Sequence, residues 1–94
     1  MAYLMIRLKV KDFSKFKSVF EEFGETRKKY GSKGVRLFRN ADNPNEVVPM
    51  SEWESIEKAK KFAQSEDLKK AMERAGSIGK PEFIYLEEVE KVSA

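Results

Sequence analysis

The sequence contains no cysteine and no histidine. Disulfides, thiolate nucleophiles and the usual zinc and haem ligands are therefore excluded. The chain also has no imidazole, the side chain that most often acts as a general base near neutral pH. No acidic cluster has the spacing of a calcium-binding loop. We therefore expect that the chain holds no metal and no cofactor.

Long apolar runs are missing as well. No segment approaches the ~20 consecutive apolar residues that a membrane span needs. The N-terminal residues alternate in polarity and lack the apolar block and cleavage site of a signal peptide. We expect a cytoplasmic protein that does not contact the membrane.

Charge of one sign is not concentrated anywhere. The 19 basic and 16 acidic residues give a net charge of +3, and they are interleaved, as in residues 66–74. Such mixed runs are typical of solvated helix faces, whereas a nucleic-acid interface needs a clustered basic patch. The sheet face also lacks the exposed aromatics and Gly-rich pattern of an RNA-recognition module. We expect no nucleic-acid partner.

What is present is a repeated strand–helix–strand pattern in a chain long enough for one domain, residues 1–94. Strict alternation predicts a strand over 3–10, and apolar residues at spacings of three and four then predict a helix of about 18 residues. Asp12 is suited to cap this helix and Gly31 to end it. Two strands follow, near 34–40 and 46–52, joined by a turn rich in Asn, Asp and Pro.

The second half repeats the plan. Ser55 is the expected N-cap of a second helix, and residues 64–67 predict a break with a new cap at Ser65. Gly76 and Gly79 are expected to end the helix, and Pro81 to open the last strand. Pro49 lies inside the third strand, which indicates an edge position, a bulge or an interrupted ladder.

The element order βαββαβ predicts an α+β, ferredoxin-like fold: a four-stranded antiparallel sheet with two helices on one face. Several strands are apolar on both faces, as at Val47 and Val48 or Phe83 and Ile84. An uncovered apolar face of several hundred Å² is rare in monomers. We therefore predict a homodimer through the sheet face, with scattered exposed aromatics as the alternative explanation.

A motif across the centre of the chain resembles the antibiotic-biosynthesis-monooxygenase-like superfamily of dimeric α+β barrels. It consists of three pieces: Glu52-Trp53, then Ser55-x-Glu57-x-Ala59-x-x-Phe62, then Ser65-x-x-Leu68-x-x-Ala71-Met72-x-x-Ala75-Gly76. The superfamily includes cofactor-free oxygenases of aromatic polyketides, haem-degrading enzymes and stress-response proteins. The haem-degrading members use a histidine that this chain lacks, and an asparagine where this chain has Ile6 and Arg7. The oxygenases of this superfamily are expected to carry an Asn-x-x-x-Trp pattern on the third strand. This chain matches the tryptophan with Trp53 but has Pro49 where the asparagine would be.

The resemblance implies a small apolar pocket between helices and sheet. Its expected lining is Phe20, Phe23, Trp53, Phe62 and Tyr85. Phenylalanines on one helix face more often form core than bind ligands, and Trp53 could equally be a core residue. Glu52 and Tyr85 are candidates for proton transfer. Arg7 and Arg36 are candidates for anion recognition, or for ion pairs with Glu52 or Glu87.

Two classes of function follow. One is a protein that binds a small apolar or aromatic molecule beside Trp53, without metal or haem. The other is a cofactor-free monooxygenase or cyclase acting on an aromatic, polyketide-like substrate. The missing histidine and the proline at position 49 favour binding, while the fold-level resemblance favours catalysis.

Overall fold

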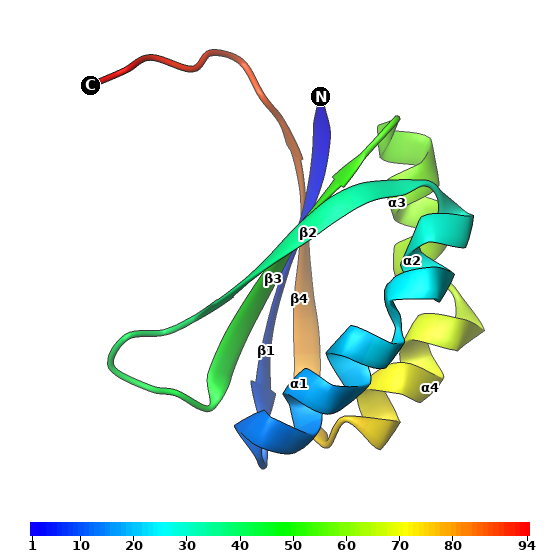
Figure 1. The fold of residues 1–94 in the computed structure, drawn as a ribbon, viewed down its shortest axis with the longest axis vertical. Coiled ribbons are helices and arrows are strands. Elements are labelled where there is room, and N and C mark those ends of the chain that lie inside the picture. Colours follow the sequence, from blue (N-terminus) through cyan, green and yellow to red (C-terminus); the bar gives the residue numbers. More distant parts are fainter.

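The computed structural model describes residues 1–94 and contains four strands and four helices (Figure 1). In chain order they are β1 (Ala2–Val10), α1 (Phe13–Glu22), α2 (Gly24–Tyr30), β2 (Ser32–Arg39), β3 (Glu46–Trp53), α3 (Ile56–Ala63), α4 (Glu66–Arg74) and β4 (Ser77–Glu87). None of these helices is long and apolar enough to cross a membrane.

The strands form one antiparallel sheet in the order β2-β3-β1-β4, and the four helices lie together on one side of it (Figure 1). This confirms the predicted ferredoxin-like fold. The alternation in β1 explains why the helices cover that side: its even-numbered residues from Ala2 to Val10 are all buried, while Arg7 and Lys9 are exposed. The core therefore lies between β1, β3 and the helices. The other side of the sheet is left open.

The helix ends are largely as predicted. The Asp12 carboxylate accepts a hydrogen bond from the Ser14 amide at 2.9 Å, and Gly31 ends α2 in the left-handed conformation, with φ 106°. Ser55 caps α3, and the Ser65 hydroxyl caps α4 by accepting from the Leu68 amide at 3.1 Å. These side chains satisfy amides that lack partners in the first helical turn.

The prediction of one continuous first helix is wrong. The chain forms α1 and α2 with a break at Phe23, which has φ −78° and ψ −1°, and Gly24 starts the second piece. Glycine is costly within a helix, so a break is favoured there. The break sets the axes of α1 and α2 at an angle over the sheet (Figure 1).

The last strand also differs from its prediction, since β4 starts at Ser77 rather than at Pro81. Ser77 and Ile78 already pair with Val10 and Lys9. The register then shifts between Ile78 and Glu82, the segment that contains Pro81, which has no amide proton to donate. Pro49 lies where the ladder is interrupted, which was one of the three predicted alternatives. It pairs with Leu37 of β2, but the ladder to β1 skips from Met50 to Val47.

Candidate functional site

A cavity of about 50 Å³ lies between the helices and the sheet and is partly open to solvent. Twelve of its 15 lining residues are hydrophobic. The lining comprises Ile6, Leu8, Phe16, Val19, Phe20, Phe23, Arg27, Val35, Pro49, Ser51, Phe62, Leu68, Ala71, Met72 and Ala75. It therefore draws on β1, β2 and β3 below and on all four helices above.

Four phenylalanines shape this cavity. Phe16 and Phe20 of α1 stack with ring centroids 5.9 Å apart, and Phe23 lies 5.9 Å from Phe62 of α3. The break at Phe23 separates α1 from α2 within this cluster. Phe20, Phe23 and Phe62, three of the five predicted lining residues, thus surround one space.

Trp53 lies outside that lining. It is fully buried, and its ring centroid is 4.8 Å from that of Phe62, which does line the cavity. Its indole Nε1 donates to the Ser51 hydroxyl at 2.7 Å, and that hydroxyl donates to the Leu4 carbonyl at 3.4 Å. The indole N–H and the hydroxyl therefore both have partners within the protein. Trp53 packs against Phe62 on the side away from the cavity and does not line the cavity itself.

Tyr85 and Glu52 are also outside the cavity lining. Tyr85 lies on the covered side of edge strand β4, with Lys60 5.6 Å above its ring, and burial raises the pKa of its phenol. Glu52 alternates with the buried Ser51 and Trp53, so its side chain is on the open side of the sheet. There its carboxylate accepts a hydrogen bond from the Tyr3 hydroxyl at 3.4 Å.

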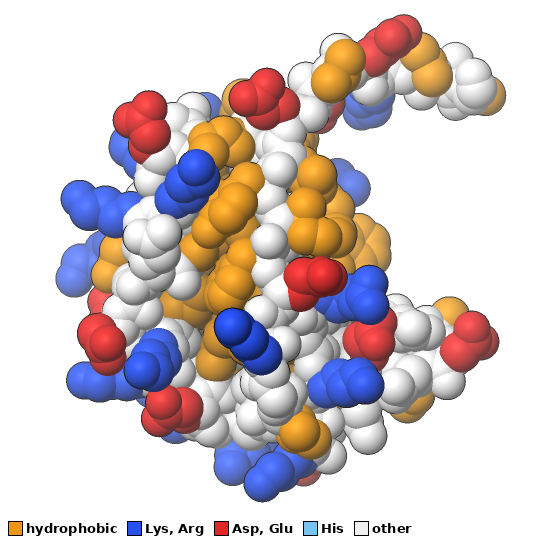
Figure 2. Space-filling model, turned by 180° about the vertical axis from the view of Figure 1, so that it is seen from behind, with side chains coloured by type: hydrophobic (Ala, Val, Ile, Leu, Met, Phe, Trp, Pro, Cys, Tyr) orange, Lys and Arg blue, Asp and Glu red, His pale blue; other side chains and the backbone are white.

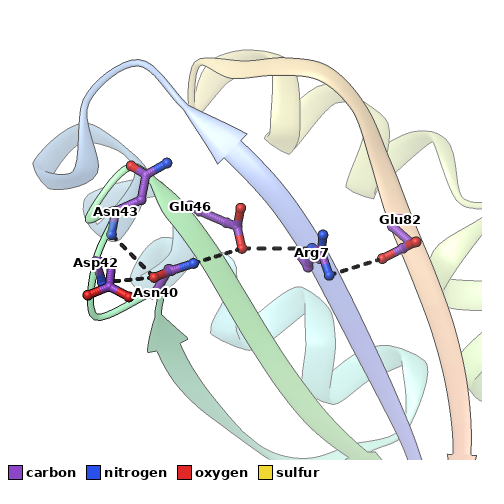
Figure 3. Close-up of polar contacts among 6 residues, drawn as sticks. All are labelled: Arg7, Asn40, Asp42, Asn43, Glu46 and Glu82. Carbon is purple, nitrogen blue, oxygen red and sulfur yellow. Dashed lines mark hydrogen bonds and ion pairs between the residues drawn. The ribbon is translucent and has the colours of Figure 1, made fainter.

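The two arginines considered for anion recognition are on the open side too. Arg7 lies between Glu46, at 3.7 Å, and Glu82, at 3.9 Å, rather than near Glu52 or Glu87. Figure 3 shows this row of side chains running across the sheet to Asn40, whose amide donates to Glu46 at 3.3 Å. Arg36 lines a broad hollow on the same side. Neither arginine faces the cavity.

The arginine that does line the cavity is Arg27, which the sequence analysis did not single out. Its guanidinium carbon lies 4.3 Å from the centroid of the Phe20 ring, and burial lowers its pKa. A signal was present, because Arg27 is four residues after Phe23 and three before Tyr30, on the apolar stripe of the helix.

The open side carries a second, wider hollow. It lies between the sheet and residues 86–91, and its lining includes Tyr3, Arg36, Phe38, Met50 and Leu86. Figure 2 shows the molecule hollowed between the projecting C-terminal residues and the β2–β3 hairpin. No group of three or more acidic side chains is placed to hold a metal ion on either side of the sheet.

The family model for antibiotic biosynthesis monooxygenases matches residues 1–74. The chain belongs to this family. No curated protein matches it closely enough in sequence to serve as a named relative.

Several solved structures share the fold at low identity. One from Bordetella bronchiseptica that carries the family's name is 17% identical, with a TM-score of 0.82 over 95% of this chain and 97% of that one. SnoaB from Streptomyces nogalater, a cofactor-independent oxygenase, is 16% identical, with a TM-score of 0.79 over 99% and 97%. One from Caulobacter crescentus is 21% identical, with a TM-score of 0.74 over 95% and 90%. At these identities the comparisons establish the fold and leave the reaction open.

Proposed function

We propose that this protein binds a small apolar or aromatic molecule in the cavity between helices and sheet, without metal or haem. The observation that carries the proposal is the cavity itself, which is apolar, partly open and lined by phenylalanines. Binding sites of small molecules are typically apolar concavities with a few polar groups. Here the polar groups are Arg27 and Ser51.

The size of the cavity limits the ligand. A closed apolar cavity of ~150 Å³ holds one benzene molecule, and this one has about 50 Å³. It therefore takes the end of a ligand, with the remainder at the open side. Phe20 and Met72 line the cavity and are only half-buried.

The second candidate is a cofactor-free monooxygenase or cyclase on an aromatic, polyketide-like substrate, and family membership favours it. The cavity offers few groups that could transfer protons in such a reaction. Glu52 is on the wrong side of the sheet, Tyr85 is outside the lining, and Ser51 is occupied by Trp53. Binding is therefore the function that the site supports better.

We further propose that two copies associate through the open side of the sheet. Met5 lies at its centre, paired with Met50 on one flank and Ile84 on the other. Phe38 and Leu86 are exposed on the same side. A second copy would remove this apolar surface from water.

The binding proposal is tested by titrating a panel of neutral aromatic and aliphatic molecules and following the amide signals by NMR. Ligands should shift residues around the cavity, and Ala71→Leu, which fills it, should abolish the shifts. Ala41→Leu, in the exposed β2–β3 loop, is the matched control and should bind normally. A flat response across the panel, or equal binding by Ala71→Leu, contradicts the proposal.

The catalytic candidate is tested by offering anthrone, which consumes one O₂ to give anthraquinone and water. We expect no oxygen uptake above that of buffer. Enzyme-dependent uptake that Ala71→Leu abolishes would instead establish the oxygenase.

The dimer is tested by sedimentation equilibrium, which should give twice the mass of one chain. Met5→Glu should give a folded monomer, because two carboxylates would be buried in the interface. The dimer is contradicted if the unaltered protein has the mass of one chain at two protein concentrations that differ about 100-fold.

A further inference from the structure

Arg27 is the only charged residue in the cavity wall. Its helical neighbours at i−4, i−3, i+3 and i+4 are Phe23, Gly24, Tyr30 and Gly31, so no carboxylate lies one turn away on either side. The four ion pairs of the chain all involve other residues. Arg27 therefore lacks an anionic partner within the protein.

Two acidic side chains on the neighbouring helices are already engaged. The Glu22 carboxylate pairs with Arg74 of α4 at 3.2 Å, and the Asp67 carboxylate accepts from the Tyr30 hydroxyl at 2.9 Å. Arg27 instead lies over the face of Phe20 at 4.3 Å. That contact orients the guanidinium by a cation–π interaction but occupies none of its five N–H donors.

Placing a guanidinium against an apolar wall has a cost. Charged groups lose hydration there, and the usual arrangement is a paired or hydrogen-bonded charge. A half-buried guanidinium, fixed over one ring and without a carboxylate, is prepared to receive an anion, because its planar fork matches the two oxygens of a carboxylate. The cavity directly beside it would hold the hydrocarbon part of the same molecule.

We propose that the ligand of this cavity is a small apolar acid, whose carboxylate pairs with Arg27 and whose hydrocarbon end enters among the phenylalanines. The inference rests on the proposed binding function and adds the charge of the ligand to it. Ser51 would not contribute, since its hydroxyl already serves Trp53 and Leu4. The single recognition group for the anion is Arg27.

Calorimetric titration of hexanoate and of 1-hexanol, at one pH and salt concentration, tests the proposal. The two probes share a chain length and differ in charge. The unaltered protein should bind hexanoate at least about tenfold more tightly, as expected for a hydrogen-bonded ion pair in a partly dry site. Arg27→Gln should remove that preference while hexanol affinity stays the same, and Arg27→Lys should retain only part of it.

Arg74→Gln is the matched control, because it removes the same charge from an exposed position on α4. It should keep the preference for hexanoate. Equal affinities for the two probes in the unaltered protein, or a preference that persists in Arg27→Gln, overturns the role of Arg27 and leaves the binding cavity intact. Failure of both probes to bind overturns the anion proposal and counts against the cavity as well. The comparison of probes in the unaltered protein does not depend on whether a variant folds.

Discussion

On the covered side of the sheet, Arg27 has an aromatic ring beside it and no carboxylate, whereas on the open side Arg7 lies between Glu46 and Glu82. The buried core of the covered side is otherwise apolar, with one satisfied polar pair, Trp53 and Ser51. The open side mixes apolar residues with charged ones, among them the row formed by Arg7, Glu46 and Glu82 (Figure 3).

This difference indicates that the covered side stabilises the fold and that the open side is suited to association. Close packing and a satisfied indole on the covered side stabilise the single chain, and the unpaired guanidinium is the group there that folding does not explain. On the open side, paired surface charges contribute little to folding, and the apolar residues between them are suited to association. Substitutions on the two sides should therefore have different effects, largest in the buried core.

Phe62→Ala should destabilise the fold by about 3–5 kcal/mol, the usual cost of emptying a buried phenylalanine site. Phe62 is 2% exposed and its ring contacts those of Phe23, Tyr30 and Trp53. A chain of this length has roughly 5–14 kcal/mol of total stability, so the loss should be visible as a large fall in the denaturant midpoint. Guanidinium unfolding monitored by circular dichroism measures it.

Phe38→Ala is the matched substitution on the open side, where Phe38 is 48% exposed. Below the concentration at which copies associate, it should change the unfolding free energy by less than about 1 kcal/mol, and it should weaken association instead. Similar losses for the two variants in dilute protein would remove the proposed division between the faces.

Ser51→Ala should destabilise the fold by about 1–3 kcal/mol. The substitution deletes the acceptor of the Trp53 Nε1 hydrogen bond and leaves a buried donor without a partner. An unfolding free energy close to that of the unaltered protein would indicate that the indole finds another acceptor. Adding Trp53→Phe, which removes the donor, should recover part of the loss in a double-mutant cycle measured by the same unfolding experiment.

The strand and helix pattern could be predicted from sequence because each element has a local cause. The buried even-numbered residues of β1 alternate over nine positions, and Asp12, Ser55 and Ser65 cap helices through their own side chains. The early start of β4 was not predictable in this way, since Ser77 joins the strand only through its pairing with Val10. Local sequence does not contain that partner.

The site was predictable only in part, for the same reason. Helical spacing places Phe20, Phe23 and Phe62 on inward faces, but it does not say that Phe62 lies in front of Trp53. Alternation places Arg7 on the polar face of β1. In β2, however, apolar residues lie on both faces, so the side on which Arg36 lies is fixed only by pairing with β3. Arg27 lies on the apolar stripe of the same helical segment, and its spacing alone does not show that it borders a cavity.

Arg7→Ala should lower stability by no more than about 0.5 kcal/mol, although Arg7 has two acidic neighbours. Its side chain is 57% exposed and both distances exceed 3.5 Å, so solvent screens the interaction and ordering the side chain offsets most of the gain. Urea midpoints at 0.05 and 0.5 M NaCl, in dilute protein, should differ little between the variant and the unaltered chain. A loss above about 1 kcal/mol would make this row of charges a structural element of the fold.

Two tyrosines offer the finest test, because their pKa values are raised for different reasons on the two sides of the sheet. A hydrogen bond from its hydroxyl to the Glu88 carboxylate, 2.9 Å long, is the main cause of the raised pKa of Tyr3, whereas burial is the cause at Tyr85. In both cases the neutral phenol is favoured in the folded protein. Its contribution to stability is therefore complete below the unfolded pKa near 10 and is lost as the pH rises through the folded pKa.

Glu88→Gln should lower the pKa of the Tyr3 phenol toward its ordinary value and leave the pKa of Tyr85 unchanged. Ultraviolet titration of phenolate absorbance measures both steps, and Tyr3→Phe identifies the step that belongs to Tyr3. High salt should reduce the shift of Tyr3, where neighbouring charges contribute, and leave that of Tyr85 in place, because screening acts on charge interactions and not on desolvation. If both steps move together in Glu88→Gln, the two sides of the sheet are electrostatically coupled and the distinction between them fails.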